Sequence, residues 1–173
     1  RIARQSIGTD GSGATDYRQS FNTPWLAASY AIAPAQTVYA SWGRGIESEV
    51  APNLPNYTNH GQALPALQSR QTEIGWKGAS EHASWSVAWF DIVRPLFDDA
   101  CNADNSVCTH QVDGTAHHRG IEANGALQRG AWTLRVGTQW LHARREGGQD
   151  AALNGLEPTN VPAYTLKLQA DYR

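Results

Sequence analysis

The sequence predicts an all-β fold, an antiparallel up-and-down meander of about eight strands, and two patterns carry this prediction. Apolar and polar residues alternate along several stretches, as they do in strands with one apolar face and one wet face. In residues 163–173, one parity reads Tyr, Leu, Leu, Ala and Tyr, and the other reads Thr, Lys, Gln, Asp and Arg. No helical period of about 3.6 residues persists anywhere in the chain.

The second pattern is an alternation of short and long connections. The short connections are residues 33–35, 78–83 and 128–130, and the long ones are residues 47–69, 94–116 and 144–161. A meander that crosses an outer membrane has short turns on one side and long loops on the other. A soluble sandwich with Greek-key crossings is not expected to alternate so regularly.

The strands between these connections are mostly close to the span that a tilted membrane strand requires. A long loop rich in Gly, Ser and Asp follows the first of them. We therefore expect a segment of a larger transmembrane β-barrel. The predicted strands are residues 1–7, 24–32, 36–46, 71–77, 84–93, 117–127, 131–143 and 163–173.

Each predicted strand has an outer face for lipid and an inner face for a hydrated lumen. On residues 131–143 the outer parity holds Trp132, Leu134, Val136 and Trp140. The inner parities of three strands supply the expected lumen-lining residues, which are Glu73, Lys77, Arg135, Gln139, Lys167 and Asp171. A solvated face with paired charges is the simpler interpretation of each.

The parity of residues 84–93 is ambiguous, because apolar residues occupy both sides of this strand. We expect Phe90 and Ile92 to point outward, since that choice puts Asp91 inside.

Composition excludes several classes of protein. No apolar run approaches the roughly 20 residues of a membrane-spanning helix, so a bilayer would be crossed by strands. Net charge is −2 without a basic block, which makes nucleic acid an unexpected partner. The chain begins at Arg1 without an initiator Met or a signal segment, so we expect a mature segment or an excised fragment.

The two cysteines, Cys101 and Cys108, lie close together in a stretch of Asp, Asn, Ser and Thr. A small disulfide-closed loop in an oxidising compartment is the favoured interpretation. Two free thiols are the alternative. A metal site is less favoured, because the spacing is too wide for Cys-x-x-Cys and no second such pair exists.

Five sequence pieces, in a fixed order, resemble the barrel of TonB-dependent outer-membrane receptors, especially those for ferric siderophores. The resemblance covers residues 24–173, with one departure: many members have Pro-Glu after the Leu64-Pro65 of this loop, whereas here Ala66-Leu67 follows. That departure bears on subfamily and ligand. The pieces are residues 37–45, residues 59–64 leading to 69–77, residues 88–92, residues 119–122 and residues 158–164.

The resemblance implies that residues 1–173 are a partial receptor barrel domain. The plug domain, the segment that engages TonB and the final strands are expected to lie outside it, since the chain stops on Tyr172-Arg173 without the family's terminal aromatic residue. It further implies a location in the bacterial outer membrane and TonB-dependent uptake of a ferric siderophore. Expected partners are the siderophore, the TonB complex through the missing N-terminal region, and lipid. No cofactor is expected, because iron arrives within the chelate.

Ligand-binding candidates belong in the long outer loops, where aromatic, positive and hydrogen-bonding side chains can hold a bulky chelate. A surface loop residue without a ligand is the simpler interpretation of each. The candidates are Tyr57, Asn59, His60, Arg94, Phe97, His110, His117 and His118.

We consider two pairs of polar residues separately, one as a possible metal site and one as an ion pair. Adjacent residues of a strand point to opposite faces, so His117 and His118 are not expected to share a metal ion. Arg44 and Glu47 at the outer end of a strand are expected to pair as a modest surface ion pair.

Two rival classes fit less well. A small outer-membrane barrel enzyme could recruit Asp91, Glu122 and the histidines, but no Gly-x-Ser-x-Gly elbow, His-Glu-x-x-His or phosphate loop occurs, so no catalytic residue is assigned. A soluble β-sandwich binding module would have to bury its outward Trp and Leu residues against a second sheet. An isolated barrel fragment has open edges and an apolar face, so we expect it to self-associate.

Overall fold

The structure is a computed structural model that describes residues 2–6 and 15–173 of the chain. Seven antiparallel strands form one sheet in the order β3-β4-β5-β6-β7-β8-β9, so every strand pairs with its neighbour in sequence. This confirms the predicted all-β antiparallel meander. The strands are β3 (Trp25–Ala33), β4 (Gln36–Glu47), β5 (Leu67–Ala79), β6 (Ala83–Cys101), β7 (Cys108–Arg129), β8 (Trp132–Glu146) and β9 (Tyr164–Tyr172).

A separate two-stranded sheet precedes the meander. β1 (Ile2–Ser6) pairs with β2 (Thr15–Gln19), so the expected first strand exists but belongs to this small sheet, and β2 was not predicted. Part of the loop expected after the first strand, residues 7–14, lies outside the described residues. The Gln19 side chain ties β2 to the long connection between β4 and β5, because its Oε1 accepts from the Ala66 backbone N–H at 2.9 Å and its Nε2 donates to the Ala66 carbonyl at 3.2 Å.

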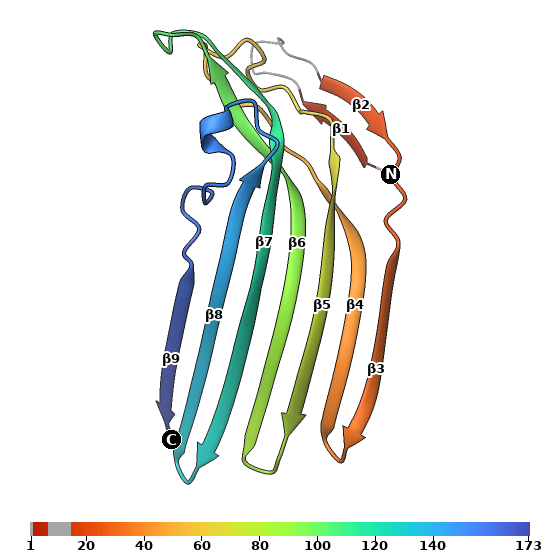
Figure 1. Cartoon of the computed structure of the whole chain (residues 1–173), viewed down its shortest axis with the longest axis vertical. Coiled ribbons are helices and arrows are strands. Elements are labelled where there is room, and N and C mark those ends of the chain that lie inside the picture. The colour runs from red at the N-terminus through yellow and green to blue at the C-terminus, as the bar shows by residue number, and fades with distance from the viewer. Residues whose placement is uncertain (1, 7–14) are drawn as a thin grey trace.

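The short turns gather at one end of the sheet and the long connections at the other (Figure 1). Two of the tight turns place a residue in the left-handed region, Ala35 at φ 57° and Gly130 at φ 60°. A single 3-10 turn, η1 (Ala151–Leu153), interrupts the connection between β8 and β9. Within the described ranges, no helix has the length and apolar character needed to cross a membrane.

The predicted long loop 94–116 is wrong, because most of it is strand. β6 and β7 stay paired up to Cys101 and Cys108, with an irregular register between Pro95 and Phe97. Only the connection 102–107 is irregular at the tip. This extension carries polar residues on both faces, so it lacks the apolar alternation by which a strand is recognised in sequence.

The strand register places the six expected lumen-lining residues on one face of the sheet, which we call the inner face. Gln139 is the partner of Thr165, Gly137 of Lys167, and Thr133 of Asp171, so the inner parities of β8 and β9 coincide. The inner face continues across the other strands, because Gln139 is the partner of Glu122 on β7, Glu122 of Ala88 on β6, and Ala88 of Gly75 on β5.

The opposite, outer face is apolar and open. Trp140 is 68% exposed and Leu168 is 74% exposed. On this face Trp89 and Trp140 share one row of the strand register, and Trp42 lies two positions further toward the long connections. We call these three residues the upper aromatic row; the Trp132 and Tyr172 rings lie 5.0 Å apart at the lower end of the face. Aromatic residues at both ends of an apolar strand face are typical of a lipid-facing barrel. In the described part of the chain no second sheet covers this face, as a sandwich would require.

The expected orientation of β6 is wrong. Phe90 is the partner of Glu73 and lies on the inner face, while Trp89 is the partner of Ile74 on the outer face. Ile92 follows Phe90 to the inner face, and Asp91 therefore points outward. Phe90 lies over Gly120 of β7, where an added Cβ would meet the Phe90 ring at 2.6 Å. Asp91 is accommodated outside because it forms ion pairs with His117 and Arg119 of β7, level with Trp42 and beyond Trp89.

Candidate ligand-binding site

A cavity of about 470 Å³ lies on the inner face near the end that carries the long connections. Gly43 shapes it: a Cβ at this position would come within 2.6 Å of the Trp25 ring, so only glycine leaves room for that indole. The lining residues are Trp25, Ser41, Gly43, Arg44, Gly45, Glu47, Ser69, Gln71, Ile92, Arg94 and His118.

Two candidates from the sequence, Arg94 and His118, supply charge and hydrogen-bonding groups to this cavity. Arg94 donates to Glu47 Oε2 at 3.1 Å, which connects β6 to β4 across β5. The guanidinium is about half exposed, with a side-chain accessibility of 49%, so it retains donors for a ligand. The expected pair between Arg44 and Glu47 is wrong, because Arg44 bonds Gln68 on the outer face and Glu47 points inward to Arg94.

His118 presents a partly buried ring to the cavity. Its Nε2 is buried and has no hydrogen-bond partner among the residues that the structure describes. An unpartnered buried ring nitrogen costs free energy unless a water or a ligand satisfies it. His118 is therefore suited to bind a polar ligand group.

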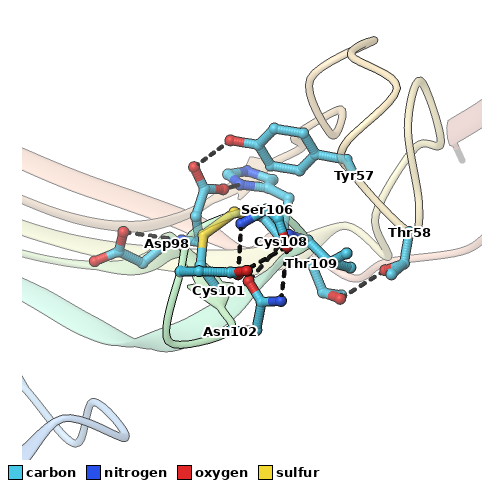
Figure 2. The surroundings of a disulfide bond; sticks show 12 residues. Tyr57, Thr58, Asp98, Cys101, Asn102, Ser106, Cys108 and Thr109 are labelled. Atoms are coloured by element: carbon cyan, nitrogen blue, oxygen red, sulfur yellow. Dashed lines mark hydrogen bonds and ion pairs between the residues drawn. A yellow bond between two sulfur atoms is a disulfide. The ribbon is translucent and has the colours of Figure 1, made fainter.

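Four other candidates meet at the long hairpin of β6 and β7, and Figure 2 shows one of them, Tyr57. Tyr57 donates from its hydroxyl to Asp99 at 2.6 Å, and Asp99 also bonds His110 Nδ1 at 2.6 Å. Phe97 stacks on the His110 ring at 6.2 Å. Asn59 binds the His110 backbone twice, donating to its carbonyl at 2.7 Å and accepting from its N–H at 3.1 Å. These contacts dock the connection 48–66 onto the hairpin. They leave the buried Nε2 of His110 without a hydrogen-bond partner among the residues that the structure describes.

A disulfide between Cys101 and Cys108 closes the tip of the same hairpin (Figure 2). Cys108 also anchors the docked connection through its backbone: its N–H donates to Asn56 and its carbonyl accepts from Thr58, both at 2.8 Å. The disulfide therefore holds the strand position to which the neighbouring connection pairs.

A charged cluster around Arg145 was not predicted from the sequence. This guanidinium, whose side chain is only 12% exposed, binds Asp98 at 2.5 Å and Asp113 at 3.0 Å. Asp113 Oδ1 accepts from the backbone N–H of Gln149 at 2.8 Å. The cluster thereby fixes the connection after β8 to the hairpin. The hydrogen bond from Arg145 lowers the pKa of Asp98. No local pattern could have revealed partners that lie 32 and 47 residues away.

The remaining two candidates lie apart from the cavity. His60 donates from its backbone N–H to the Tyr57 carbonyl at 3.3 Å within the connection 48–66. His117 points to the outer face, opposite to His118, and bonds Asp91 at 3.0 Å. Over the described ranges no group of three or more His, Cys, Asp or Glu residues could hold a metal ion.

Further from the long connections, the inner face carries a network of polar residues. Tyr39, which was not predicted, donates to Glu73 at 2.6 Å, and Lys77 lies 5.6 Å from the centre of the Tyr39 ring. Arg135 forms an ion pair with Asp171. Lys167 and Gln139 line a smaller pocket of about 210 Å³ together with Glu122. This face is polar and charged where the outer face is apolar.

Nearly the whole chain matches one protein family. The family described as TonB dependent receptor-like, beta-barrel matches residues 3–173. The ferrichrome receptor FcuA of Yersinia enterocolitica is 31% identical over 118 residues, which are 66% of this chain and 15% of that receptor.

Two solved structures share the fold. The ferric preacinetobactin receptor BauA of Acinetobacter baumannii superposes with a TM-score of 0.69 at 23% identity, covering 91% of this chain and 24% of that one. The ferripyoverdine receptor of the outer membrane of Pseudomonas aeruginosa gives a TM-score of 0.65 at 20% identity, covering 91% of this chain and 21% of that one. The chain thus spans a quarter or less of the length of these relatives.

Proposed function

Because this chain belongs to the TonB-dependent receptor β-barrel family, whose barrels lie in the bacterial outer membrane, we propose that it forms part of the wall of a receptor for ferric siderophores. One relative is a ferrichrome receptor, and the two structural neighbours described above are receptors for ferric preacinetobactin and ferripyoverdine. The proposal extends their ligand class to this chain.

The observation that carries the proposal is the cavity on the inner face beneath the long connections. Its volume of about 470 Å³ falls within the range of small-molecule sites. Trp25 offers an aromatic surface, Arg94 a positive charge and His118 an unpartnered nitrogen. These groups suit a bulky chelate with carbonyl or anionic oxygens. Tyr57, Asn59, Phe97 and His110 act through the docked connection above the cavity.

The inner face below the cavity gives the ligand a hydrated path. Glu73, Lys77, Gln139 and Lys167 would face a plug domain of the complete receptor, and the TonB complex would supply the energy for release. Iron enters and leaves within the chelate, so the receptor needs no resident cofactor and performs transport rather than catalysis. β3 and β9 would pair with further barrel strands, and without them the isolated chain would associate with itself.

Binding of ferric siderophores to the complete receptor tests this function. Arg94→Gln removes a charged donor from the cavity and should weaken binding of the cognate chelate about tenfold to a hundredfold. Arg129→Gln removes the same charge at the short-turn end of β7 and should leave the affinity unchanged. A panel of ferric chelates can be screened by quenching of tryptophan fluorescence. Equal affinity of wild type and the Arg94 variant for every chelate that binds would refute the assignment of this cavity.

A further inference from the structure

Two arginines lie side by side on the outer face, just beyond the upper aromatic row. Arg44 of β4 and Arg70 of β5 are direct partners in the strand register. Both side chains are exposed. Arg44 lies over the Trp42 ring at 5.9 Å and donates to Gln68 at 3.3 Å, which fixes its direction as outward. Like charges that face each other across two strands are destabilising.

No acidic side chain of the described part of the chain forms an ion pair with either arginine. Glu47 points to the inner face and is held by Arg94. Asp91 is on the outer face, but its oxygen is already shared by His117 and Arg119 at 3.0 Å each. The positive charge of Arg44 and Arg70 therefore remains uncompensated.

The position of Arg44 and Arg70 along the strands indicates which group neutralises their positive charge. Trp42 marks the upper aromatic row, and such rows lie at the boundary between hydrocarbon and headgroups. Arg44 is two residues beyond Trp42, which is about 7 Å along a strand. The headgroup layer on each side of a bilayer is about 5–7 Å thick. Arg44 and Arg70 thus face the headgroups of the outer leaflet.

We propose that Arg44 and Arg70 together bind the phosphate group of an outer-leaflet lipid. A guanidinium matches phosphate oxygens with two parallel hydrogen bonds, and one phosphate between the two arginines removes their repulsion. Trp42 and the apolar outer face below it receive the acyl chains of the same lipid. This site lies on the face of the sheet opposite to the inner-face cavity, although Arg44 also contributes to the lining of that cavity. It depends on the membrane location of the family but not on the siderophore.

Native mass spectrometry of the complete, detergent-solubilised receptor tests the proposal. The probes are phosphatidic acid, diacylglycerol with the same acyl chains, and inorganic phosphate. The wild-type receptor should retain phosphatidic acid and release diacylglycerol. The double substitution Arg44→Gln/Arg70→Gln should lower the apparent affinity for phosphatidic acid about thirtyfold, whereas Arg44→Lys/Arg70→Lys should preserve most of it. Arg119→Gln serves as a matched control on the same face, because its charge is already paired with Asp91.

Three outcomes would overturn the proposal. They are equal retention of phosphatidic acid and diacylglycerol by the wild type, unchanged retention by the double glutamine variant, and displacement of the lipid by millimolar inorganic phosphate. The first and third comparisons use the wild type alone, so they hold even if a variant fails to fold. Circular dichroism establishes that the variants retain their β structure.

Discussion

Arg145 connects three segments of the chain through one guanidinium. It binds Asp98 of β6 and Asp113 of β7, and Asp113 in turn holds the Gln149 amide. Arg145→Gln leaves the buried Asp113 carboxylate without its charge partner, which costs on the order of 3 kcal/mol. We therefore predict that hydrogen exchange of the Gln149 amide accelerates about a hundredfold, as measured in the complete receptor.

The control for this cluster is a double substitution. Arg145→Gln/Asp113→Asn removes the uncompensated charge, so it should recover part of the lost protection. Protection should also depend on pH. The folded-state pKa of Asp98 lies below its ordinary value because of Arg145, so this stabilisation is complete above about pH 4 and is lost as the pH falls further. Unchanged exchange in Arg145→Gln would mean that the cluster does not hold the connection.

At the scale of elements, the hairpin of β6 and β7 supports the connection 48–66. Asn59 makes two hydrogen bonds to the His110 backbone, whereas Tyr57 makes one side-chain bond to Asp99. Asn59→Ala should therefore raise the rate of proteolytic cleavage within 48–66 about thirtyfold, since two net hydrogen bonds are lost. Tyr57→Phe is the matched control, because it removes only one hydrogen bond. It should raise the cleavage rate by a smaller factor than Asn59→Ala does. Equal cleavage rates in the two variants would contradict this ranking.

The hairpin also shows where sequence patterns stop being informative. Strands in contact with lipid were predictable because their two faces differ, and β8 and β9 match the expected spans within a few residues. Beyond the aromatic row both faces meet water, so residues 94–101 of the 19-residue β6 and residues 108–116 of the 22-residue β7 were expected to form a loop. Only long-range pairing and the Cys101–Cys108 disulfide keep that extension in register.

The candidate site was predictable only in part for a related reason. Arg94 and His118 were identified among the ligand-binding candidates assigned to the long outer loops. The strand register brings them together with Trp25 and Gly43, which no local pattern marked. On β6 apolar residues occupy both parities, so the sequence could not decide between Trp89 and Phe90 as the lipid-facing residue. The partner strand decides it, because Gly120 leaves space for Phe90 on the inner face.

At the scale of the whole molecule, one sheet separates two environments. The apolar outer face of Trp140 and Leu168 is exposed, and the inner face carries Glu73, Arg135 and Lys167. A lipid on one side and a hydrated lumen on the other satisfy both faces without a second sheet. The inner cavity faces the lumen and the paired arginines of the outer face meet the lipid headgroups, so both assignments require this separation.

Site-directed spin labelling along β9 of the complete receptor in a lipid bilayer tests that separation most directly. Cysteine substitutions at 164–172 carry nitroxides in turn, and their collision rates with oxygen, which concentrates in lipid, are compared with those of a water-soluble nickel complex. The predicted result is an alternation with a period of two, with Leu168 favouring oxygen and Gln169 favouring the nickel complex. Rates without alternation, or water access at Leu168 equal to that at Gln169, would contradict the barrel wall.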